Sequence, residues 1–219
     1  MSLLYYINDD DLNGCHLEAL FSFFMAYAAV PANKPINLKK GQAISLTKKI
    51  NLEKKELSID NLHVGLGWDV SARGGVDFDL DALAYCQKQD GSWDTSYACN
   101  YSQLDTPNGA LHHCGDNLTG EGEGDDEVIE VKVSKLPPHI VLVRFQVSIY
   151  DAVKRKQHFG KVQNAFIRLV NMDTHEELCR YTLSDDEFSG YTKVLMGIVR
   201  RTANNDWEFV AEGKGISKK

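Results

Sequence analysis

The run Glu127-Val-Ile-Glu-Val-Lys-Val133 decides the fold class, because its side chains alternate between two environments. Glu130 and Lys132 fall on one face of an extended chain, whereas positions 129, 131 and 133 are apolar. One-sided burial of this kind is typical of an antiparallel sheet with one face toward solvent. The run therefore predicts a β-strand in a layered all-β domain.

Similar short runs continue on both sides of this segment, separated by Gly, Asn, Asp or Pro. We expect a hairpin turn at Asn204-Asn205, a short helix over 152–157, and strands over 43–47, 56–66, 80–87, 97–101, 127–133, 140–149, 165–171, 176–183, 191–202 and 206–211. About ten strands are too many for one flat sheet. The sequence predicts a β-sandwich of two antiparallel sheets.

The amino-terminal part of the chain has a different character. Residues 13–30 are rich in helix formers and end before Pro31 and Pro35, so they predict a helix, and residues 31–42 read as a linker. We therefore divide the chain into a helical extension over 1–38 and a β-sandwich domain over 39–219. The apolar side chains of the helix nearly encircle its axis, which favours packing on the domain or on a second copy. A reversible contact with a membrane surface is the alternative.

The same region argues against a membrane span and against export. The longest apolar run, Leu17–Val30, is shorter than the roughly 20 residues that a transmembrane helix needs. Three acids at positions 9–11 precede it, where a secretory signal would carry basic residues. We expect no transmembrane segment.

The composition of the chain indicates which partners it disfavours and in which cellular compartment we expect it. A formal net charge of −7 over 219 residues disfavours nucleic-acid binding, which depends on clustered cations. The 5 cysteines form no C-x-x-C pair, so the sequence predicts neither a disulfide framework nor a thiolate zinc site. A cytoplasmic location fits this pattern.

Two acidic segments interrupt an otherwise even distribution of charge. The first is Asp69 followed by Asp77-Phe-Asp79-Leu-Asp81, whose aspartates at every second position share one face of a strand. The second, Gly115-Asp-Asn-Leu-Thr-Gly-Glu-Gly-Glu-Gly-Asp-Asp-Glu127, holds 6 acids and no base, with glycines interleaved. Glycine permits tight turns in which carboxylates and carbonyls converge.

A solvated acidic loop is the simplest interpretation of one such run, but two runs together favour a bound cation. Ca²⁺ takes six to eight oxygen ligands from flexible backbone, whereas Mg²⁺ prefers a strict octahedron and keeps several waters. Adjacent His112, His113 and Cys114 lack the spacing of a tetrahedral zinc site. Neither acidic run has the residue order of an EF-hand loop.

The motifs Val64-Gly-Leu-Gly-Trp-Asp69, Phe78-Asp-Leu-Asp-Ala82, Gly115–Glu127 and Asn164-Ala-Phe-Ile-Arg168 resemble those of the TerD family of tellurite-resistance and stress proteins. The resemblance runs from about residue 39 to residue 213 and implies a calcium-binding β-sandwich in the cytoplasm. Carried over by position, it implies that Ca²⁺ is held by Asp69, Asp79, Asp81, Asp116, Asn117, Glu121, Glu123, Asp125 and Asp126, with the carbonyl of Leu118 in addition. These residues supply more oxygens than one ion needs, so we expect two adjacent Ca²⁺ ions.

No catalytic motif accompanies these segments, so we expect a calcium-dependent binding or scaffold module and not an enzyme. Its expected partners are Ca²⁺ and proteins of a stress-response complex, and peripheral membrane contact stays open. The alternatives are a protein that binds a cyclic nucleotide or another small anion, and thiol-based detoxification of tellurite. For the latter, Cys114 adjoins the acidic loop, where anionic surroundings raise the pKa of a thiol. We expect Cys114 to be buried and inert.

Overall fold

The computed structural model describes residues 34–50, 55–69, 78–115, 124–183 and 185–218. They belong to one compact unit, Lys34–Lys219. The helix predicted over 13–30 lies outside the described residues. Within the described ranges, no helix has the length and hydrophobicity that a membrane crossing requires.

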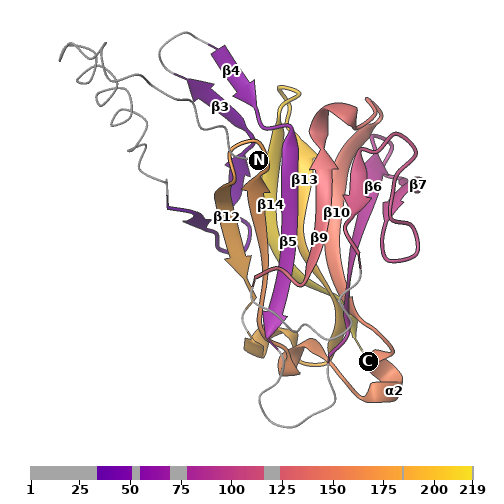
Figure 1. The fold of residues 1–219 in the computed structure, drawn as a ribbon. Coiled ribbons are helices and arrows are strands. Elements are labelled where there is room, and N and C mark those ends of the chain that lie inside the picture. The colour runs from indigo at the N-terminus through magenta and orange to yellow at the C-terminus, as the bar shows by residue number, and fades with distance from the viewer. Residues whose placement is uncertain (1–33, 51–54, 70–77, 116–123, 184, 219) are drawn as a thin grey trace, which may run out of the picture. The chain divides into compact units, whose positions relative to one another are not determined.

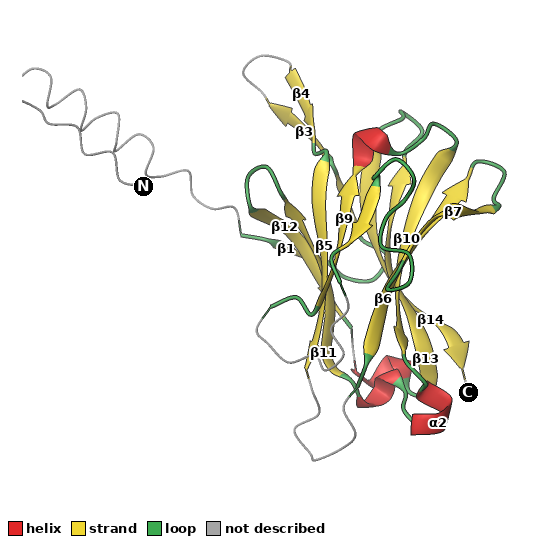
Figure 2. Cartoon of the chain, turned by 45° about the vertical axis from the view of Figure 1, so that its right-hand side comes forward, coloured by secondary structure: helices red, strands yellow, loops and turns green. Residues whose placement is uncertain are grey.

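Two six-stranded sheets face each other across the core, which confirms the predicted all-β sandwich (Figures 1 and 2). Sheet A has the order β1 (Ile36–Asn37), β12 (Glu176–Thr182), β11 (Gln163–Asn171), β5 (Asn61–Asp69), β9 (Glu127–Lys132) and β8 (Leu111–His113). Sheet B has the order β2 (Ala43–Ser45), β14 (Trp207–Lys218), β13 (Tyr191–Arg201), β10 (Ile140–Ile149), β6 (Leu80–Lys88) and β7 (Trp93–Cys99). A separate hairpin joins β3 (Thr47–Ile50) to β4 (Lys55–Ser58).

Alternation along each strand builds the core between the sheets. In sheet A, Val64 of β5 and Ile129 of β9 are fully buried, and in sheet B Phe145 of β10 is fully buried. These side chains join one continuous apolar cluster. The alternation of β9 confirms the prediction from the sequence. Its odd-numbered positions enter the core, and Glu130 and Lys132 face away from it.

The short helical elements lie between strands and match the sequence in part. Helix α2 (Ala152–Arg155) falls within the segment predicted to be helical, and the turn between β13 and β14 contains Asn204-Asn205 as expected. Single 3₁₀ turns occupy η1 (Val133–Lys135), η2 (Phe159–Lys161) and η3 (Asp185–Phe188).

Several strand predictions need correction. Strand β1 lies in the segment interpreted as a linker, and it pairs in parallel with β12, whereas the other strand pairings within the described ranges are antiparallel. Strand β8 was not predicted. The strand expected over 56–66 divides into β4 and β5, because the amide of Ile59 leaves the hairpin and donates to the carbonyl of Leu46 at 2.8 Å.

We define the α2 end of the sandwich as the end where β5 and β10 finish and β6, β9 and β11 begin. Helix α2 follows β10 there (Figure 1). The described parts of both acidic segments also reach this end, because they lie at the start of β6 and the start of β9.

Candidate functional site

Asp79 and Asp81 lie at the start of β6 with little exposure to solvent. Leu80 and Ala82 enter the core, so the alternating aspartates project from the opposite face of the strand. Each aspartate is only 7% exposed. The backbone of Asp79 accepts a hydrogen bond from the amide of Tyr150 at 2.8 Å, and its Oδ2 lies 3.7 Å from Nη2 of Arg155. The structure thus places two shielded carboxylates in succession on one face of β6.

Asp125 lies on the outer face of sheet A and is held by the side chains of Arg168 and His63. Arg168 donates from Nε to Oδ1 at 2.7 Å and from Nη2 to Oδ2 at 2.9 Å. Nε2 of His63 lies 2.6 Å from Oδ2. Burial alone would raise the pKa of the Asp125 carboxyl, but the hydrogen bonds and charges of His63 and Arg168 outweigh burial and lower that pKa. Both oxygens of this carboxylate are therefore engaged by protein groups.

The glycines of β5 make room for this arrangement. A Cβ atom on Gly65 would lie 2.2 Å from Cγ of Asp125, so the carboxyl group rests directly on the strand backbone. A Cβ atom on Gly67 would lie 2.4 Å from the ring of Phe166. The two glycines of Val64-Gly-Leu-Gly-Trp-Asp69 thus permit close approach to the strand, which any side chain would prevent.

Arg168 also belongs to a wider network on the same face. Its Nη1 donates to Oε2 of Glu177 at 2.9 Å, and Arg180 donates from Nε to Oε1 of Glu177 at 2.9 Å. The guanidinium of Arg180 lies 4.1 Å from the ring centroid of Phe166. Phe166 and Arg168, both in the motif Asn164-Ala-Phe-Ile-Arg168, therefore anchor the segment that holds Asp125.

Asp69, the last residue of β5, and Asp126, directly before β9, lie near enough for their charges to interact. Oδ2 of Asp126 accepts a hydrogen bond from the backbone amide of Trp68 at 2.8 Å. Burial, together with the charges of Asp125 and Asp69, raises the pKa of Asp126 despite that hydrogen bond. Asp69 is exposed, and its Oδ2 accepts a hydrogen bond from the side-chain amide of Asn164. A bound cation would relieve the repulsion between these carboxylates.

Glu127 connects the two sheets and was not among the predicted site residues. Its side chain enters the sandwich, where it accepts a hydrogen bond from the amide of Ala82 in β6. Nε2 of His113, which is also buried, lies 3.5 Å from its Oε2. The sequence held a signal for this role, since Glu127 occupies an inward position in the alternation of β9. This contact joins the segment of Asp125 and Asp126 to the strand of Asp79 and Asp81.

The predicted ligand set thus divides into three groups. Asp79 and Asp81 lie on β6 of sheet B, and Asp69, Asp125 and Asp126 lie at the ends of β5 and β9 in sheet A. Asp116, Asn117, Leu118, Glu121 and Glu123 lie outside the described residues. Within the part of the chain that the structure describes, no group of three or more His, Cys, Asp or Glu side chains comes close enough to hold a metal ion.

The expectation that Cys114 is buried is wrong. Cys114 is exposed and not buried, because it follows the last residue of β8 at the edge of sheet A. Partial desolvation and the charge of Glu130 raise its pKa, which lowers the thiolate fraction. Burial raises the pKa of Cys86, Cys99 and Cys179 to about 12. These thiols are poor nucleophiles at neutral pH.

The sequence of this chain is similar to those of one family of known proteins. The TerD domain matches residues 35–219. General stress protein 16U of Bacillus subtilis (strain 168) is 43% identical over 182 residues, which cover 82% of this chain and 90% of the relative. Tellurium resistance protein TerD of Serratia marcescens is 42% identical over 179 residues, covering 80% and 92% respectively.

A solved structure shares the fold. The crystal structure of a homologue of telluride resistance protein TerD from Streptomyces coelicolor A3(2) superposes with a TM-score of 0.60 at 23% identity. The superposition covers 73% of this chain and 92% of the other. At this level of identity the likeness concerns the sandwich alone.

Proposed function

The chain belongs to the TerD domain family, and from that premise we propose that it is a calcium-dependent binding protein of the tellurium-resistance and stress response. It acts in the cytoplasm, without catalysis, and serves as a binding or scaffold module for partners of that response. Its close relatives bear the names of stress and tellurium-resistance proteins, which supports the biological setting.

The pair Asp79 and Asp81 carries this proposal. Two carboxylates that are each 7% exposed and follow one another on one face of a strand repel each other in the absence of a counter-charge. Arg155 lies 3.7 Å from the Asp79 carboxylate and contributes a single positive charge to this pair. A divalent cation removes the repulsion, and carboxylate oxygens are its preferred ligands.

We propose that the remaining ligands come from the segments of sheet A that reach the α2 end and from the acidic segment before β9. Asp69 and Asp126 supply carboxylates at the end of β5 and the start of β9, and residues 116–123 supply the other oxygens. Ca²⁺ requires about six to eight oxygens, so a set divided over these segments is sufficient for two ions. Calcium would supply the charge and the rigid coordination that hold the loops of this end together.

We assign Asp125 a different role within the same proposal. Both of its oxygens accept short hydrogen bonds from Arg168 and His63, so ligation would require the loss of those bonds. Asp125 therefore positions the neighbouring Asp126 and does not itself bind the ion.

Calorimetric titration of the full-length protein with Ca²⁺ tests the proposal. We expect saturable binding in wild type and a loss of at least tenfold in affinity for Asp81→Asn. Asp105→Asn is the matched control, because Asp105 is an exposed carboxylate that contacts His112 and does not belong to the proposed ligand set. Absence of calcium binding at millimolar concentration, or equal effects of the two substitutions, would refute the assignment.

A further inference from the structure

The turn that contains α2 displays apolar side chains at the α2 end. Val153 is 68% exposed and Tyr150 is 49% exposed. The single helical turn lies between Asp151 and Lys156, which adopt left-handed backbone conformations with φ of 51° and 54°. Non-glycine residues in this region are strained, and such strain persists where the surrounding structure enforces it. These two residues bracket the turn that carries Val153.

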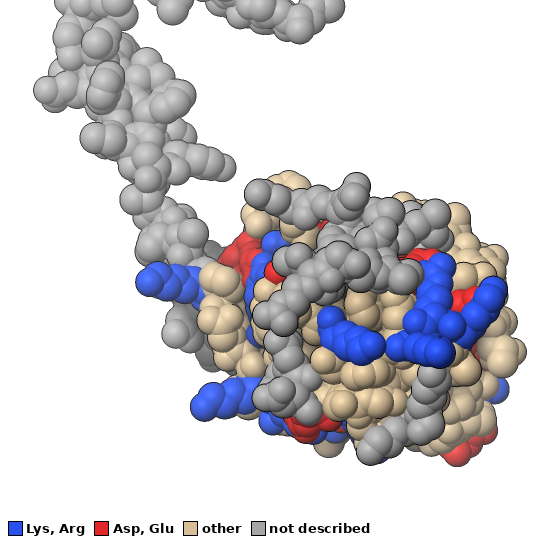
Figure 3. All heavy atoms as spheres, turned by 90° about the horizontal axis from the view of Figure 1, so that it is seen from below, with Lys and Arg blue, Asp and Glu red and all other residues tan. Residues whose placement is uncertain are grey.

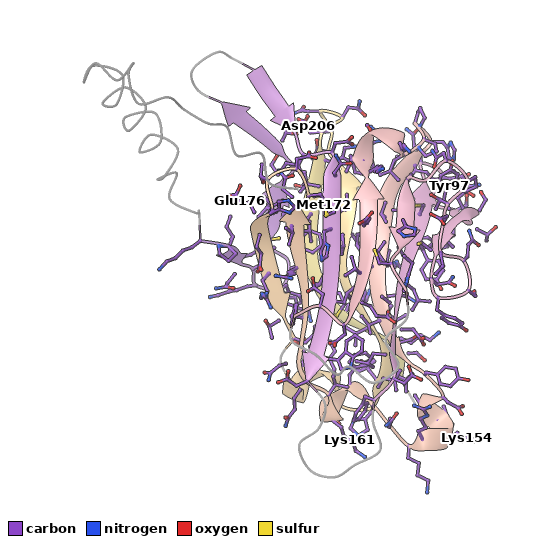
Figure 4. The ribbon with its side chains drawn as sticks, in the orientation of Figure 1. Tyr97, Lys154, Lys161, Met172, Glu176 and Asp206 are labelled. Carbon is purple, nitrogen blue, oxygen red and sulfur yellow. The ribbon has the colours of Figure 1, made fainter. Side chains whose placement is uncertain are left out.

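Cations surround these side chains. Lys154, Lys156 and Lys161 are exposed, and Arg155 is half-buried with its guanidinium 5.3 Å from the ring centroid of Tyr150. Figure 4 places Lys154 and Lys161 at the same end of the molecule, opposite Asp206. In the view onto this end, several Lys and Arg side chains gather around a surface of uncharged residues (Figure 3). We define the α2 face as the exposed side chains in and next to this turn, namely Tyr150, Val153, Lys154, Lys156 and Lys161.

The α2 face adjoins the candidate ion site directly. The amide of Tyr150 donates to the carbonyl of Asp79 at 2.8 Å, and Arg155 lies 3.7 Å from the Asp79 carboxylate. Without a bound cation, the carboxylates of Asp79 and its neighbours counteract the positive potential of the lysines. Neutralisation of those carboxylates leaves the lysines as the dominant charges of this face.

We propose that the α2 face docks on membranes that contain anionic lipids, with Val153 inserted among the headgroups and Lys154, Lys156 and Lys161 bound to lipid phosphates or carboxylates. The calcium dependence of this docking rests on the proposed function. The small apolar area argues for a bilayer partner, because a stable protein interface buries about 800 Å² on each side. One exposed aliphatic side chain, one half-exposed aromatic side chain and three exposed lysines match the interfacial zone of a bilayer.

Co-sedimentation of the full-length protein with vesicles tests the docking. The vesicles contain phosphatidylcholine alone or phosphatidylcholine with 30% phosphatidylserine, each with calcium or with chelator. We expect binding to the anionic vesicles in calcium and at least tenfold weaker binding in chelator. A lysine near an anionic surface contributes about fivefold to affinity, the equivalent of about 1 kcal/mol. Lys154→Gln combined with Lys156→Gln should therefore reduce binding about twenty-five-fold.

Controls separate this face from other surfaces. Lys132→Gln combined with Lys135→Gln removes the same charge from exposed positions at the opposite end and should leave binding unchanged. Val153→Ser should weaken binding without loss of thermal stability, because the side chain is 68% exposed. Equal binding of the two double variants, or capture of soluble polyglutamate as strongly as of vesicles, would overturn the docking proposal.

Calorimetry on the same samples distinguishes the two proposals. Calcium binding without vesicle binding refutes the membrane docking and leaves the proposed function intact. Vesicle binding that depends on Lys154 and Lys156 but not on calcium supports the docking and refutes its dependence on the ion site.

Discussion

The environment of Asp125 illustrates how strongly one residue can depend on distant partners. His63 lies 62 residues before it in the chain, and Arg168 lies 43 residues after it. Neither distance follows from a local pattern, so the sequence gives no reason to separate Asp125 from the other acids of its segment. The fold distinguishes Asp125 from the other acids, because β5, which contains His63, pairs with β11, which contains Arg168.

Asp125→Asn should lower the free energy of unfolding by about 2 kcal/mol at pH 7, because hydrogen bonds to a charged group are lost. The folded state lowers the pKa of Asp125, so its contribution is present above the unfolded value of about 3.9 and disappears as the pH falls through the folded value. Urea unfolding at pH 7, 5 and 3 measures the difference between wild type and variant. A difference that does not shrink at pH 3 would contradict the ion pair.

Gly65→Ala should act through the same carboxyl group. The added Cβ would lie 2.2 Å from Cγ of Asp125 and would displace it from Arg168. We expect a loss of about 2 kcal/mol or more, and strong non-additivity with Asp125→Asn, because both changes remove one interaction. A double-mutant cycle by urea unfolding provides the measurement. Simple addition of the two losses would mean that Gly65 is required for another reason.

At the scale of elements, sequence alternation predicts the long strands and fails for the short ones. Strand β9 and helix α2 follow from local pattern. Strands β1 and β8 contain 2 and 3 residues, and their partners β12 and β9 decide that they are extended. The candidate site behaves likewise. Spacing predicts that Asp79 and Asp81 share one face, but the passage of Glu127 between the sheets follows only from their packing.

Glu127 should be the residue of β9 whose acceptor function matters most for the link between the sheets. Glu127→Ala leaves the amide of Ala82 without its partner and should cost about 3 kcal/mol, since a buried donor is left unsatisfied and a cavity forms. Glu127→Gln keeps an acceptor and should recover most of that loss. Chemical unfolding together with hydrogen exchange at Ala82 provides the measurement. Equal losses for both variants would assign the effect to the charge opposite His113.

At the scale of the whole molecule, calcium should determine thermal stability. A ligand at 100 times its dissociation constant stabilises by about 2.7 kcal/mol, which raises the melting temperature of a domain of this size by about 5–10 °C. Asp81→Asn should lose most of this gain in calcium, yet in chelator it should melt at the wild-type temperature or slightly higher because one repulsive charge is gone. Melting curves of both proteins provide the measurement. Equal destabilisation with and without chelator would identify Asp81 as a structural aspartate.

The narrow borders of the two sheets have a consequence for self-association. Sheet A ends in β1 and β8, and sheet B ends on one side in β2, a strand of 3 residues. Such short borders offer another chain little backbone on which to extend a sheet. Strand β1 shields the seven-residue β12, and the amide of Leu38 donates to the carbonyl of Arg180 at 2.8 Å. Leu38→Pro removes that donor and should let copies of the chain polymerise through β12, visible as faster growth of light scattering on mild heating than in wild type. The two residues of β1 would then determine whether the protein stays monodisperse or forms fibres through β12.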